Sequence, residues 1–166
     1  MDTLLAIASR RDQRRYLPEP LEEEIVTRIL DAGRLAGSGS NRQPWTFVLV
    51  EDRDRIEALA PAVFAPENVL GAGLVLAVVV RGTGPVSFDA GRAAQNMMLA
   101  AWNEGVASCP NGVSDPDTAA EICGADVKLV LSFGYPATPR DPESRSVAEW
   151  SARARRKPLD ELVRRV

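Results

Sequence analysis

The stretch Gly37-Ser38-Gly39-Ser40-Asn41-Arg42-Gln43-Pro44-Trp45 joins a helical pattern, residues 21–36, to an apolar, partly β-branched strand pattern, residues 46–50. Its glycines free the backbone, and Pro44 fixes the entry into the strand. The amides of Asn41 and Gln43 can donate and accept hydrogen bonds at once. Such a loop can present main-chain N–H groups and amides to a flat ligand with polar edges. From composition alone, an ordinary helix-to-strand connection is the plainer interpretation.

Helical and strand patterns continue on both sides of this loop. We expect helices over 3–9, 21–36, 52–59, 88–104 and 115–123, and strands over 46–50, 74–80 and 127–133. Strand 74–80 is apolar throughout, which predicts burial on both faces. Helix 88–104 has Ser87 as its expected N-cap and is apolar nearly all round, so it must be buried. We expect irregular segments over 61–73 and 137–150, and a tight turn at Pro110-Asn111-Gly112.

Composition and charge exclude several classes of protein. The 166 residues carry 20 basic and 23 acidic side chains and no histidine. Without histidine, Ser-His and Cys-His catalysis are excluded, and no metal site is expected. Cys109 and Cys123 lack metal-ligand spacing and indicate reduced thiols. No stretch is long and apolar enough for a membrane span, and no broad basic face indicates a nucleic acid. We expect one cytoplasmic domain, residues 1–166.

Basic residues gather at both ends of the chain. Residues 1–20 hold four arginines and three acids, and residues 140–166 hold eight basic and five acidic residues, so the acidic excess lies between them. The planar guanidinium fork matches the oxygens of a phosphate. Both ends could therefore converge on one small anion. Taken alone, each segment is more simply a solvated basic turn or tail.

Together, these segments resemble the FMN-dependent nitroreductase family. Residues similar to its loop signature are Ser38, Asn41, Gln43, Pro44 and Trp45, with Gly37 where the family has proline. The run Arg10-Arg11-Asp12-Gln13-Arg14-Arg15-Tyr16 resembles its N-terminal arginine motif, with Asp12 in place of serine. Further similar segments are its long central helix at 89–101, the strand end Phe133-Gly134-Tyr135-Pro136, and the basic cluster before Pro158. The matches follow the family's order along the chain.

The resemblance implies an α+β fold, with a mostly antiparallel central sheet flanked by helices, and an intertwined homodimer. It also implies tightly bound FMN. The implied cofactor-binding residues are Arg10, Arg11, Arg14, Ser38, Ser40, Asn41, Gln43, Pro110, Asn111, Gly112, Arg155 and Arg156. Main-chain N–H groups of Asn111 and Gly112 are expected near the flavin N5. No side chain is expected to be catalytic, since the flavin carries the chemistry, and Cys109 is expected to be a packed thiol.

The activity implied by the resemblance is ping-pong hydride transfer. NAD(P)H reduces the flavin at N5 and leaves, and a nitroaromatic, quinone or similar conjugated acceptor is then reduced. Two alternatives stay open. One is a different reaction on the same scaffold, reductive dehalogenation or flavin cleavage. The other is a flavin-binding protein with little turnover, since the chain is short for the family. The acceptor and the donor (NADH, NADPH or a deazaflavin) are also left open.

Overall fold

The structure, a computed structural model, describes residues 1–166 and falls into two compact units. Unit 1 consists of Met1–Arg11 and Arg140–Val166, and unit 2 of Asp12–Pro139. The expectation that the whole chain forms one domain stays a prediction. No helix in either unit is long and apolar enough to cross a membrane.

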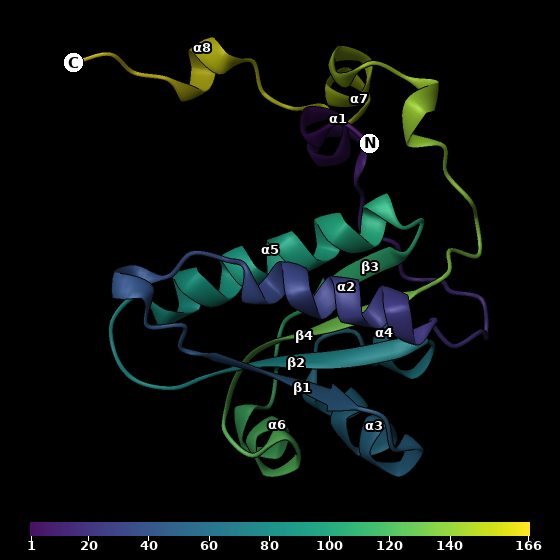
Figure 1. Cartoon of the computed structure of the whole chain (residues 1–166), viewed down its shortest axis with the longest axis vertical. Coiled ribbons are helices and arrows are strands. Elements are labelled where there is room, and N and C mark those ends of the chain that lie inside the picture. Colours follow the sequence, from purple (N-terminus) through teal and green to yellow (C-terminus); the bar gives the residue numbers. More distant parts are fainter. The chain divides into compact units, whose positions relative to one another are not determined.

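An antiparallel sheet forms the middle of unit 2 (Figure 1). In spatial order its four strands are β1 (Trp45–Val50), β2 (Leu74–Val80), β4 (Asp126–Gly134) and β3 (Ala107–Asn111). The ladder of β1 and β2 runs without interruption, whereas that of β2 and β4 shifts register between Val78 and Val79. The sheet and its covering helices confirm the predicted fold class.

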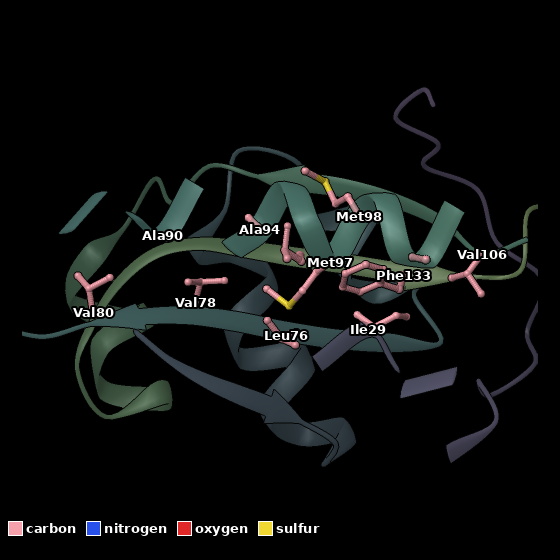
Figure 2. Packing of buried hydrophobic residues seen from close by; sticks show 12 residues of the cluster. Ile29, Leu76, Val78, Val80, Ala90, Ala94, Met97, Met98, Val106 and Phe133 are labelled. Carbon is pink, nitrogen blue, oxygen red and sulfur yellow. The ribbon is translucent and has the colours of Figure 1, made fainter. Parts of the chain in front are cut away.

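The side chains of β2 alternate between two cores on opposite faces of the sheet. Leu76, Val78 and Val80 pack with α2 (Glu23–Arg34) and α5 (Val86–Asn103), as Figure 2 shows for the first core. The residues that alternate with them along the strand, Val75, Ala77 and Val79, pack in a second core. It is covered by α3 (Arg53–Leu59), α4 (Pro66–Leu70) and α6 (Pro116–Cys123). The predicted burial of this strand on both faces is therefore confirmed, and its two-residue period explains the division.

Helix α5 is packed closely against α2 in the first core. A Cβ atom at Gly33 of α2 would lie 2.9 Å from Cγ of Met97, so only glycine permits this approach. The predicted N-cap of α5 is wrong. The helix begins earlier, at Val86, so Pro85 occupies the cap position and Ser87 lies in the first turn. It begins there because the ring of Pro85 disfavours a helical conformation in the residue before it. Gly105 follows the helix with φ 74°, the left-handed conformation in which glycine is favoured just after a helix end.

Three segments that were predicted to be irregular, or to form a turn, contain helices or a strand. Residues 61–73 contain α4, which begins at Pro66 because proline is favoured in a first helical turn. Pro110 and Asn111 belong to β3 and form no tight turn; β3 is an edge strand, where proline is tolerated. Residues 137–150 contain a short 3-10 helix, η3 (Pro142–Ser144), and the start of α7 (Val147–Arg153), which a Ser146–Glu149 capping box begins.

Unit 1 is built from the two ends of the chain. Helix α1 (Thr3–Ser9), whose N-cap is Asp2, packs against α7, and α8 (Leu159–Leu162) follows near the C-terminus. Trp150 of α7 is 3% exposed, and its Nε1 donates a hydrogen bond to the carbonyl oxygen of Pro142 at 2.8 Å. Trp150 therefore anchors the C-terminal segment.

Candidate functional site

The loop of residues 37–44, here called the site loop, has a strained backbone. Ser40, Asn41 and Gln43 have φ values of 52°, 54° and 48°, a region that costs non-glycine residues roughly 1–3 kcal/mol each unless the surroundings hold them there. The hydroxyl oxygen of Ser38 accepts a hydrogen bond from the Gln43 N–H at 2.8 Å. The side chains of Asn41 and Gln43 remain exposed. Strain of this kind is typical of ligand-binding loops, and here it accompanies exposed amides.

A carboxylate of α5 holds the site loop in place. Asp89 is 3% exposed, and its Oδ2 accepts a hydrogen bond from the Gly39 N–H at 3.2 Å. The partners are fifty positions apart in the sequence. Sequence reasoning missed this role of Asp89, although an acid within an otherwise apolar helix is a signal that it needs a partner.

Arginines from both ends of the chain gather in unit 1. The pKa of Arg11 is lowered, first by burial and then by repulsion from other guanidinium groups. Those groups belong to Arg156, Arg140, Arg10 and Arg153, in decreasing order of effect. Like charges held together in this way would be stabilised by an anion bound among them. The structure thus brings together Arg10, Arg11 and Arg156 of the predicted set.

Arg11 also has a structural role. Its Nη1 donates to the carbonyl oxygens of Ala8 at 2.6 Å and Arg10 at 2.7 Å, and its Nη2 donates to that of Trp150 at 2.9 Å. These bonds close the end of α1 and tie it to α7. Arg155 is exposed and has φ 51° just after α7. A cofactor-binding role for Arg155 stays a prediction.

Arg14, the remaining predicted arginine, lies in unit 2 on a segment beside β3 and β4. The N–H of Gln13 donates to the carbonyl oxygen of Ser108 at 3.1 Å, and the N–H of Leu17 to that of Tyr135 at 2.8 Å. The side chain of Arg14 is exposed between these two attachments. The segment is therefore held along the sheet, with Arg14 free to face a ligand.

The side chain of Asn111 is buried in β3 and does not face a ligand. It is 4% exposed; its Nδ2 donates to the carbonyl oxygens of Cys109 and Val130, and its Oδ1 accepts from Asn68 Nδ2 at 2.9 Å. Cys109 is a buried thiol that forms no disulfide, and the expectation of a packed thiol is met. The amide thus stabilises the strand end. The proposed main-chain donors at Asn111 and Gly112 stay a prediction.

Tyr16 and Ser132 connect Asn111 to the segment that carries Arg14. The Tyr16 hydroxyl donates to the carbonyl oxygen of Gln13 at 2.7 Å and lies 3.0 Å from Ser132 Oγ, which in turn lies 3.1 Å from Asn111 Nδ2. Burial raises the pKa of Tyr16 well above its usual range. Sequence reasoning missed this network, because its members become neighbours only when β3, β4 and the N-terminal segment pair.

This architecture defines a class: α+β proteins with a helix-flanked antiparallel sheet and a strained, amide-bearing loop between α2 and β1. The chain belongs to the nitroreductase family, because the sequence model described as "Nitroreductase family" matches residues 7–83 and 86–135. A protein of Methanothermobacter thermautotrophicus, provisionally named an NADH dehydrogenase/NAD(P)H nitroreductase, is 32% identical over 152 residues. That match covers 82% of this chain and 78% of the relative.

Solved structures share the fold. A nitroreductase family protein of Clostridium difficile superposes with a TM-score of 0.81 at 24% identity, covering 99% of this chain and 98% of that chain. The NADPH:FMN oxidoreductase of Vibrio harveyi, solved with NAD+, superposes with a TM-score of 0.74 at 23% identity, covering 81% of this chain and 68% of that chain. The family, fold and oxidoreductase class predicted from the sequence are confirmed.

Proposed function

We propose that this chain is an FMN-dependent oxidoreductase that passes a hydride from NAD(P)H to a nitroaromatic, quinone or similar conjugated acceptor. The observation that carries the proposal is the gathering of Arg10, Arg11 and Arg156 from opposite ends of the chain. The family match supports it, as do the names of the archaeal relative and of the Vibrio enzyme.

The residues present suit FMN chemically. Its phosphate is a dianion, and the guanidinium groups of unit 1 repel one another in its absence. Its ring has donor and acceptor edges, which the exposed amides of Asn41 and Gln43 and the main chain of the strained site loop can match. The residues that would hold it are Arg10, Arg11, Arg14, Ser38, Ser40, Asn41, Gln43, Pro110, Asn111, Gly112, Arg155 and Arg156. Bound FMN would supply the hydride chemistry.

The residues of the chain would orient the bound cofactor and stabilise its charge, and no side chain would exchange a proton. Hydrogen bonds that main-chain N–H groups of the site loop donate to Asp89 and Ser38 keep the loop in its strained form, so little ordering is left for the moment of binding. The buried amide of Asn111 holds the end of β3, where the proposed N–H donors lie. A preorganised main-chain donor needs no titrating group, which suits a chain without histidine.

The proposed assembly is a homodimer in which α5 packs against a second copy. Phe88 of α5 is 68% exposed and Leu35, just after α2, is 65% exposed. Phe88 lines a groove together with Ala36, Gly91 and Asn96. Large exposed apolar side chains around a groove are typical of a surface that another protein covers, and this supports the dimer.

The decisive test is an absorption spectrum of the purified protein, followed by anaerobic titration with NADH and with NADPH. A flavin spectrum that either nicotinamide bleaches, with turnover of nitrofurazone or menadione, supports the proposal. Protein that stays colourless after FMN is added contradicts it. Flavin that neither nicotinamide reduces would indicate a binding protein, and flavin that is consumed would indicate a cleavage enzyme.

A matched pair of variants tests the phosphate site. Arg156→Ala should weaken FMN binding about tenfold, because a hydrogen bond to a charged group is lost. Arg55→Ala removes an exposed arginine of α3 and should leave FMN affinity unchanged. Fluorescence titration of the apoprotein with FMN measures both. Equal affinities for the two variants would remove Arg156 from the site.

A further inference from the structure

A second loop, Arg81–Pro85 between β2 and α5, encloses a hollow together with the site loop. In Figure 1 both loops lie at the same end of the sheet, where β2 leads into α5. The hollow, here called the loop hollow, measures about 460 Å³. Its polar lining residues are Arg42, Gln43, Thr46, Arg81, Thr83 and Asp89. That volume suits a small ligand or one end of a larger one.

Left-handed backbone conformations are concentrated in these two loops. Gly82 and Gly84 have φ values of 90° and 93°, and the site loop adds three further residues with positive φ. Elsewhere in unit 2 only Gly105 and Gly124 have positive φ, and both follow the ends of helices, where this conformation is ordinary. The site loop is therefore held in a costly conformation, a feature typical of binding sites, whereas glycine lets the second loop turn beside it without that cost.

The guanidinium group of Arg42 fits between glycines of the two loops. A Cβ atom would lie 3.3 Å from its Nη2 if built on Gly84 and 3.4 Å if built on Gly39. Its Nε donates to the carbonyl oxygen of Gly39 at 3.2 Å and its Nη1 to that of Thr83 at 3.4 Å, whereas Nη2 makes no hydrogen bond. Arg42 is thus held in position and retains a free donor.

Arg81 supplies a second cation. Its side chain is exposed and makes no hydrogen bond or ion pair, and Arg42 has no acidic partner. Unit 2 as a whole carries ten basic and seventeen acidic residues, so acidic partners are abundant elsewhere. Asp89 is the one carboxylate of the hollow, and it already accepts from Gly39. Two cations against one acid leave the hollow positive.

We propose that the loop hollow binds the oxyanion group, a phosphate or a carboxylate, of the reductant or acceptor in the oxidoreductase proposed above. The planar fork of Arg42 and the charge of Arg81 would bind the oxyanion, and the hydroxyls of Thr46 and Thr83 can donate to it. Gln43 belongs both to this hollow and to the proposed cofactor set. A ligand anchored here would therefore lie beside the cofactor. This inference rests on the proposed function.

The test measures equilibrium binding to FMN-loaded protein by calorimetry, with two pairs of probes that differ in one anionic group. One pair is 2′,5′-ADP against 5′-AMP, and the other is 4-nitrobenzoate against 4-nitrobenzamide. In at least one pair, the charged member should bind about tenfold more tightly. Preference in the first pair assigns the oxyanion to a phosphorylated nicotinamide, and preference in the second assigns it to the acceptor.

Variants decide whether the preference arises in the hollow. Arg81→Ala should abolish it, Arg55→Ala should leave it unchanged, and Asp89→Asn should strengthen binding of the charged probe several-fold while keeping an acceptor for Gly39. No preference in either pair, or a preference that survives Arg81→Ala, overturns the proposal. These results are distinct from failure of the proposed function, which would show as protein that takes up no FMN.

Discussion

The interior of unit 2 and its site loop hold polar groups in opposite environments. Beside β3, the amide of Asn111 is 4% exposed and bonded to three other residues in addition to Ser132. In the site loop, Asn41 is exposed and its backbone is held in an unfavourable conformation. The interior gains stability from its polar groups, whereas the loop keeps its groups available at a cost in stability. Stability and binding therefore depend on different residues.

The largest expected effect comes from emptying part of the interior. Met97 of α5 is fully buried against α2. Met97→Ala should therefore lower the free energy of unfolding by about 2–5 kcal/mol, because apolar burial is lost and a cavity remains. Urea unfolding measures the change. Glu121→Ala, at an exposed position of α6, is the control and should change stability by less than about 0.5 kcal/mol. Similar losses in both variants would contradict the packing described.

A smaller effect concerns the interior polar network and pH. Because burial raises the pKa of Tyr16, its phenol stays neutral in the folded chain at pH values where the unfolded chain ionises. Its contribution to stability is thus complete below about pH 10 and decreases above it, by up to about 1.4 kcal/mol per pH unit. Tyr16→Phe should show a shallower decrease between about pH 8 and about pH 11. Burial also raises the pKa of Cys123, but this residue is present in both proteins, so its contribution to the pH dependence of stability is the same in both. Parallel curves would show that Tyr16 does not titrate differently on folding.

The smallest effect is expected in the site loop and has the opposite sign. Ser40→Gly removes the strain of a positive φ but adds freedom to the unfolded chain, so we expect a net stabilisation of about 0.5 kcal/mol. FMN should bind more weakly, because the loop is less rigid before binding. Ser40→Ala retains the strain and is the control. If Ser40→Gly lowers stability, the strain assigned to this loop is not real.

Several elements could be predicted because their signals are local. The apolar run 74–80 and the short helix 3–9 match β2 and α1 at both ends, since turn-forming residues or a cap bound each of them. The helix expected over 21–36 is shorter, Glu23–Arg34, because terminal turns lack tertiary support. The turn expected at Pro110-Asn111-Gly112 was wrong for a different reason: pairing with β4 overrides a local turn preference.

The candidate site likewise has a part that could be predicted from the sequence and a part that could not. The site loop could be located from residue types, since glycine, serine and amide side chains between a helix and a strand indicate a binding loop. The bond between Asp89 and Gly39, and the shared hollow of Arg42 and Arg81, could not be predicted, because they join positions some forty to fifty residues apart. Such pairs depend on which strands are neighbours.

By itself, the sequence determined the chain's family, its helices and strands in outline, and the identity of the loop between α2 and β1. Tertiary structure alone decided that Asn111 is buried and that Arg11 bonds to the end of α1 among other guanidinium groups. It also decided that the site loop and the loop 81–85 share one hollow. The physical reason is range. Backbone preferences act over a few residues and can be read along the chain, whereas burial, repulsion and shared cavities arise only between segments that folding brings together.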